Sequence, residues 1–73
     1  MAELTYTKGI YTAIATVREL AVDKYQGVVS LGRDDGDEQE NTVYEVEATS
    51  ATPEEALEEA KALAHRILGE IEL

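Results

Sequence analysis

The last 22 residues, TPEEALEEAKALAHRILGEIEL, carry the strongest structural signal in this 73-residue sequence. Thr52 is a good N-cap, and Pro53 suits the first helical position because its missing N–H would be unpaired there in any case. Glu55 completes a Thr-x-x-Glu capping box. The sequence therefore predicts a helix that begins at Pro53 and ends at Gly69, a natural C-cap, or continues one turn further to Ile71.

This helix is amphipathic. At 100° per residue, its apolar side chains fall within an arc of roughly 140°. They are Ala56, Leu57, Ala60, Leu63, Ala64, Ile67, Leu68 and Ile71. The opposite side carries Glu55, Glu58, Glu59, Ala62 and Arg66. Such a helix needs an apolar surface to pack against, and the rest of the chain must supply it.

The residues before the helix have the character of β-strands. Residues 41–49 alternate in polarity, which predicts a half-buried strand whose outer face carries Glu45 and Glu47. Residues 24–31 are rich in β-formers, so the two runs are expected to pair as a hairpin around residues 31–41, turning at Asp35 and Gly36.

The first segment, Leu4 to Leu20, allows two readings. Ile10, Ile14 and Val17 have helical spacing, but the stretch is dense in β-branched and aromatic residues, and we interpret it as one strand followed by a turn at Asp23 and Lys24. The predicted fold is α+β: a three-stranded antiparallel meander with one C-terminal helix on one face, in the order β-β-β-α, forming a single domain over residues 1–73.

Composition limits how such a domain can be stabilised. The sequence has no Cys, Phe or Trp, so disulfides and cysteine-ligated metals are excluded and the large side chains are four Tyr with Leu, Ile and Val. A chain this short buries only about 60% of the surface that it exposes when unfolded. The N-terminus lacks the pattern of a signal peptide and no apolar run reaches the ~20 residues of a membrane span, so we expect a cytoplasmic protein.

The formal charge of −10 is unevenly distributed. Residues 1–33 carry four basic and three acidic groups, for a net of +1, whereas residues 34–73 carry two basic and 13 acidic groups, for a net of −11. An acidic surface repels nucleic acids and anionic lipids, so a basic protein is the expected partner. The candidate partner-binding residues are Asp34, Asp35, Asp37, Glu38, Glu40, Glu45, Glu47, Glu54, Glu55, Glu58 and Glu59.

The run LGRDDGDEQE, residues 31–40, is the densest part of this field, and its role has several interpretations. As a calcium loop starting at Asp35, it has Glu40 where the EF-hand requires Gly and Val46 where it requires Glu, so that template fails. The remaining interpretations are a solvated hairpin tip, a docking surface for a basic protein and an acidic cation site of another kind. The helix glutamates likewise fit either a docking stripe or a solubilising exterior.

Catalysis is not indicated. No large apolar side chains accompany the carboxylates to form a pocket, and His65, the only histidine, lies at the border of the apolar arc, where a packing or solvent role is typical. No Gly-x-Ser-x-Gly or Gly-rich phosphate motif occurs. The sequence therefore predicts no enzyme, no catalytic or metal site and no cofactor.

The segment TPEEALEEAKALAHRIL, which follows a Tyr-x-Val-x-Ala strand, resembles the β-β-β-α half-barrel of HicB-type antitoxins, in which a Thr-x-Glu-Glu-Ala helix start follows a three-stranded sheet. Short bacterial proteins with the same element order look similar. The resemblance implies a module that covers a basic toxin.

Together these patterns predict a non-catalytic protein-binding module for a basic partner, either antitoxin-like or a mimic of nucleic-acid phosphates. Two alternatives remain at this point. One is a divalent-cation-binding protein, and the other is a structural homodimer formed through the open sheet face or an edge strand.

Overall fold

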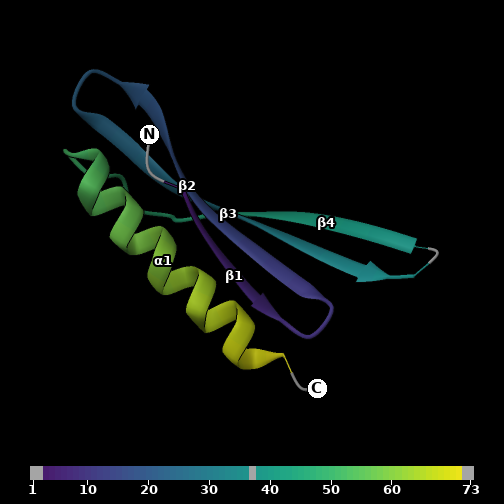
Figure 1. Ribbon diagram of the computed structural model, residues 1–73. Helices are drawn as coiled ribbons and strands as arrows, with labels where there is room; N and C mark the ends of the chain where they lie inside the picture. Colours follow the sequence, from purple (N-terminus) through teal and green to yellow (C-terminus); the bar gives the residue numbers. More distant parts are fainter. Residues whose placement is uncertain (1–2, 37, 72–73) are drawn as a thin grey trace.

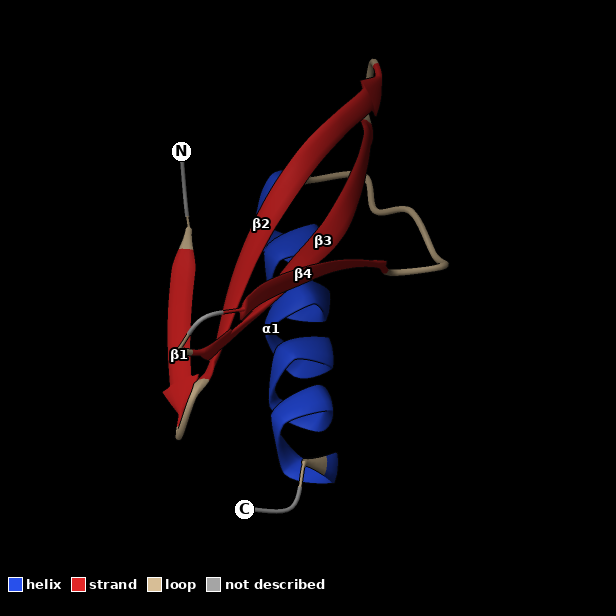
Figure 2. Cartoon of the chain, turned by 90° about the vertical axis from the view of Figure 1, so that its right-hand side faces the viewer, coloured by secondary structure: helices blue, strands red, loops and turns tan. Residues whose placement is uncertain are grey.

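The computed structural model describes residues 3–36 and 38–71. Four antiparallel strands form one sheet in the order β1-β2-β3-β4, and one helix follows them and packs across one face (Figure 1). Of the described elements, none covers the other face (Figure 2). The elements are β1 (Leu4–Lys8), β2 (Tyr11–Ala21), β3 (Lys24–Asp35), β4 (Glu38–Glu45) and α1 (Pro53–Glu70). The predicted α+β class, with an antiparallel sheet and one C-terminal helix, is confirmed.

The sheet has four strands and not the predicted three, because the segment Leu4 to Leu20 divides at Gly9. Lys8 pairs with Tyr11, which leaves Gly9 and Ile10 as a two-residue turn. The φ angle of Gly9 is 59°, a conformation that glycine adopts without steric cost and that suits the first central residue of a tight hairpin. The interpretation of this segment as one strand was therefore wrong.

The turn between β2 and β3 also differs by one residue from the prediction. Ala21 pairs with Lys24, so Val22 and Asp23 form the turn and Lys24 already belongs to β3. Asp23 has φ 58°, the left-handed conformation that Asp tolerates better than most residues.

The last strand begins earlier than predicted and is not half-buried. β4 runs from Glu38 to Glu45, and all eight of its residues are exposed. The chain then leaves the sheet and returns at Ser50, whose backbone exchanges two hydrogen bonds of 2.8 Å with Tyr25. The strand predicted over residues 41–49 is thus displaced toward the acidic run, and Glu47 lies outside it.

The helix begins as predicted. The Thr52 hydroxyl accepts a hydrogen bond of 3.2 Å from the Glu55 N–H, and Pro53 occupies the first turn. The helix continues through Gly69 to Glu70, with Ile71 as the C-cap, so the longer of the two predicted ends is correct. In the described part of the chain, no helix has the length and apolar character needed to cross a membrane.

A lysine from the sheet stabilises the C-terminal end of α1. The Lys8 ammonium donates hydrogen bonds to the carbonyl oxygens of Leu68, at 2.7 Å, and Ile71, at 3.0 Å. The Leu68 carbonyl also accepts a hydrogen bond of 3.3 Å from the Ile71 N–H, and a cation at this end of the helix interacts favourably with the helix dipole. Lys8 thereby links β1, the edge strand farthest from β4, to the end of the helix.

The core between sheet and helix is built from small side chains. Its largest fully buried side chain is Val29. The buried hydrophobic residues are Ala13, Ala15, Val29, Ala56, Ala60, Ala64, Ile67 and Leu68. Partly buried Leu, Ile and Tyr side chains surround this cluster, including Tyr6, Tyr11 and Leu31. Because alanines occupy most of the centre, helix and sheet approach one another closely.

The closest approach is at Gly27 of β3. A Cβ atom at Gly27 would lie 2.6 Å from the Ala56 carbonyl oxygen and 2.9 Å from the Ala60 Cβ. Neither atom belongs to the end of a flexible side chain, so a methyl group at this position would force backbone movement. The absence of a side chain at Gly27 is therefore a requirement for the way α1 packs.

We predict that Gly27→Ala destabilises the protein by about 1–3 kcal/mol, because α1 must shift away from β3 to admit the methyl group. The measurement is the free energy of unfolding from urea denaturation followed by circular dichroism. Gly69→Ala is the matched control: a Cβ there meets nothing within 4 Å, and alanine favours the helix by up to about 1 kcal/mol. Equal stabilities for the two variants would contradict this account of the packing.

Candidate protein-binding surface

The acidic run forms the outer end of a two-stranded hairpin and is not an irregular loop. Asp34 and Asp35 end β3, while Glu38 and Glu40 lie in β4, so that Asp35 pairs with Glu38 across the hairpin. The turn contains Gly36, whose φ is 75°, as predicted, but Asp35, which was predicted to share the turn, is the last residue of β3. Asp37 lies outside the described residues.

We call residues 33–45, the outer part of β3 with all of β4, the acidic arm. It extends away from α1, which packs mainly on β2 and β3 (Figure 1). The molecule is correspondingly elongated, with extents of 41 × 21 × 19 Å. An isolated two-stranded hairpin has little intrinsic stability, so its pairing with β2 along β3 supports it.

Arg33 is the basic residue within the acidic arm. Its guanidinium lies 3.0 Å from the Asp35 carboxylate and 3.7 Å from that of Glu40. In the register of the sheet, Arg33 lies directly opposite Glu40. Arg33 thus reduces the repulsion between carboxylates on neighbouring strands, but acidic groups still outnumber it in the arm.

Glu45 and Glu47 were predicted to share an outer strand face, and the structure separates them. Glu45 ends β4 on the face away from α1, where the Arg18 guanidinium lies 2.9 Å from its carboxylate and also donates a hydrogen bond to Gln26. Gln26 in turn donates a hydrogen bond of 3.0 Å to the Val46 carbonyl oxygen. Glu47 lies in the link between β4 and α1, and its position on a strand was wrongly predicted.

The helix glutamates do not join the outer end of the acidic arm. The exposed residues Glu54, Glu55, Glu58 and Glu59 occupy the first turns of α1. In Figure 1 this end of the helix lies at the upper left, whereas the outer ends of β3 and β4 lie at the right. The structure therefore separates the carboxylates at the outer end of the arm from those in the first turn of α1, whereas Glu59 lies near Glu45 and Glu47.

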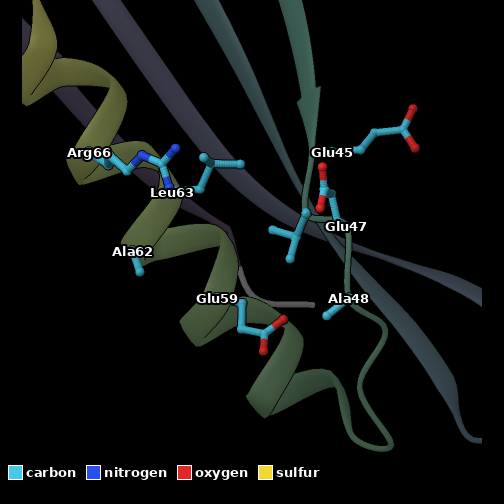
Figure 3. Close-up of a pocket in the computed structure, with 8 residues that line it drawn as sticks. Glu45, Glu47, Ala48, Glu59, Ala62, Leu63 and Arg66 are labelled. Carbon is cyan, nitrogen blue, oxygen red and sulfur yellow. The ribbon is translucent and has the colours of Figure 1, made fainter.

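A groove between α1 and the link after β4 was missed by sequence reasoning. Its volume is about 510 Å³. It is lined by Glu45, Val46, Glu47, Ala48, Glu59, Ala62, Leu63 and Arg66. Figure 3 shows Leu63 pointing from the helix toward the link, while the Glu45 side chain points away from the groove. The helical periodicity placed Ala62 and Arg66 on the water side, and only the path of the link gives them a neighbour.

Within residues 3–36 and 38–71, no three acidic or histidine side chains lie together in a way that could hold a metal ion. His65 is exposed, and its ring lies against that of Tyr6 of β1 in a tilted arrangement, with the centroids 4.4 Å apart and 52° between the ring planes. The acidic arm offers carboxylate groups and the unpaired N–H and C=O groups of an edge strand.

Comparisons with protein-family models, with curated proteins and with solved structures found no match to this chain. The resemblance to HicB-type antitoxins therefore stays a prediction.

We predict that Arg33→Gln loosens the outer end of the arm, because the carboxylates of Asp35 and Glu40 lose their shared counter-ion. An exposed ion pair contributes up to about 1 kcal/mol, so the amide protons of Glu40 and Thr42 should exchange with solvent about two- to five-fold faster. The measurement is residue-resolved hydrogen exchange by NMR. Arg66→Gln, which removes an exposed pair with Glu70 on α1, should leave these rates unchanged. Unaltered exchange in the Arg33 variant would show that the pairs do not hold the arm together.

Proposed function

We propose that this chain is a non-catalytic protein-binding module and that the acidic arm is its docking site for a basic protein. The observation that carries the proposal is the exposure of β4. It is an edge strand in which every residue is exposed, and it carries Glu38, Glu40 and Glu45. Such a strand offers a partner both charge and free backbone groups.

The free backbone groups of β4 can be assigned from the hydrogen-bond pattern. The Val46 N–H donates to the Gly27 carbonyl oxygen at 2.9 Å, so Val46 faces β3. Backbone groups alternate in direction along an antiparallel strand, and the register of β4 is regular. The N–H and C=O groups of Gln39, Asn41, Val43 and Glu45 therefore point outward from the sheet. An extended segment of a partner can pair with them as a fifth strand.

Charge selects which segment can do so. Residues 33–45 contain one basic and six acidic side chains, a net of −5. An extended segment rich in Lys and Arg would gain from this field, both in the rate of encounter and in the stability of the complex, whereas an acidic segment would be repelled. The same charge keeps β4 from pairing with β4 of another copy, which is a common use of charged residues on edge strands.

The groove beside the arm supplies an apolar contact. Val46, Ala48 and Leu63 line it next to the end of β4. An apolar side chain of the partner can enter there, flanked by Glu47 and Glu59, which favour a neighbouring Lys or Arg. A docking site that combines a strand edge with a pocket obtains affinity from the backbone and specificity from the side chain.

The proposal predicts that the chain, used as bait in an extract of its native host, retains a basic protein. It also predicts that β4 contributes to the binding of that protein. Glu38→Gln with Glu40→Gln should reduce the affinity of the recovered protein at least ten-fold, because both carboxylates lie on the docking strand. Binding by either form should weaken as salt increases, since exposed charge contacts are screened.

The matched control is Glu54→Gln with Glu58→Gln, which removes the same charge from exposed positions of α1 that do not line the groove. It should retain the partner nearly as well as the unaltered chain. Recovery of no basic protein at low or physiological salt would contradict the proposal. Equal losses with both double variants would show that net charge, and not the acidic arm, accounts for binding.

A further inference from the structure

The face of the sheet opposite α1 is a second exposed surface with a different character. We call it the open face. Its centre is formed by two adjacent rows of the register: Ile14 with Ser30 and Val43, and Thr16 with Val28 and Glu45. Val43 lies opposite Ser30 and is 61% exposed. The open face therefore presents aliphatic and hydroxyl side chains to solvent.

Glu45 is the one charged side chain in these two rows, in a chain whose net charge is −10. It pairs with Arg18, with 2.9 Å between the guanidinium and the carboxylate, so the two side chains are neutral as a unit. The carboxylates of α1 lie on the other side of the sheet. Two copies of this chain can thus bring the centres of their open faces together without placing unpaired acidic groups in contact.

The monomer has more surface than its mass requires. Its accessible area is 5005 Å², against about 4,450 Å² for a typical monomer of 8.0 kDa. Its radius of gyration is 12.7 Å, against about 11.2 Å for a compact domain of this length. Together with a core made largely of alanine, these values indicate that the single chain buries little apolar surface and would gain stability from a second layer.

The open face is large enough to supply that layer. With strands about 4.8 Å apart and about 3.3 Å of rise per residue, the four strands without their acidic ends at residues 33–35 and 38–40 span roughly 475 Å². Two copies would bury about 950 Å² in total, close to the lower limit for a specific interface. The edges are poorer candidates, since β1 has only five residues and β4 would place glutamates against glutamates.

We propose that the open face packs against the same face of a second copy, which gives a two-fold symmetric dimer of two sheets between two outer helices. Packed sheets lie about 10 Å apart, so Ile14, Val28 and Val43 of the two copies interdigitate. This proposal does not depend on the proposed function. This packing covers the faces of the sheets but not their edges, so the β4 edge of each copy stays exposed and the dimer presents two acidic arms.

The experiment is sedimentation equilibrium of the full chain from about 5 to 500 µM. We expect the mass to approach twice 8.0 kDa as concentration rises. Val43→Glu should weaken association at least ten-fold, because it places a charge at the centre of the interface. Val22→Glu is the matched control: Val22 is 85% exposed in the turn between β2 and β3, so this variant should associate like the unaltered chain.

Thr16→Glu separates face packing from edge pairing. Thr16 lies on β2 and its backbone faces Val28 of β3, so this change weakens a dimer formed through the open face but not one formed through the β1 or β4 edge. Circular dichroism should give the unaltered helix content for all three variants. A chain that stays monomeric at 500 µM, or a dimer that tolerates Thr16→Glu, would overturn the proposal.

Discussion

The close contact between α1 and the sheet at Gly27 determines what the rest of the molecule can do. Alanines on the helix and glycine on β3 let the backbones approach, and the N-cap at Thr52 and the Lys8 hydrogen bonds fix the two ends of the helix. A helix is about 10–12 Å wide, whereas four strands span about 19 Å. One helix seated on β2 and β3 therefore cannot also cover β4.

Two surfaces remain uncovered as a consequence, and they differ in charge. The acidic arm has carboxylates and an unpaired strand edge, which suit a basic extended segment. The open face has the apolar side chains of Ile14, Val28 and Val43 at its centre, which suit a second copy of the chain. One surface is an edge and the other is a face, so both can be occupied at the same time. In this account the small core and the unbalanced charge have one explanation: the chain is a subunit that binds other chains through these two surfaces.

The features that the sequence predicts well are local. The start of α1 follows from Thr52, Pro53 and Glu55, and its buried side follows from the spacing of alanines and leucines, because both signals operate within a few residues. The turn at Gly9 was missed because the β-rich residues on either side form a continuous pattern. The acidic run was predicted to lie between the two strands of a hairpin, and the structure extends both strands into it as far as Asp35 and Glu38. Asp and Glu disfavour strands in general, but an exposed edge strand accommodates them.

The candidate site was predictable to the same extent. Asp34, Asp35, Glu38 and Glu40 are close in sequence and stay close in the hairpin. Their separation from Glu54 and Glu58 depends on which way β3 and α1 run, and the pairing of Glu45 with Arg18 joins residues 27 positions apart. The groove requires the link after β4 to lie beside α1, which no local pattern specifies.

The availability of the β4 edge is the central claim, and residue-resolved amide exchange tests it most directly. In the free protein, the amide protons of Gln39, Asn41, Val43 and Glu45 should exchange rapidly while those of Glu40, Thr42 and Tyr44 are protected. Binding of the basic protein recovered from the host should protect the first set. Protection of the outward amides in the free chain, or no change in their exchange on binding, would contradict the account.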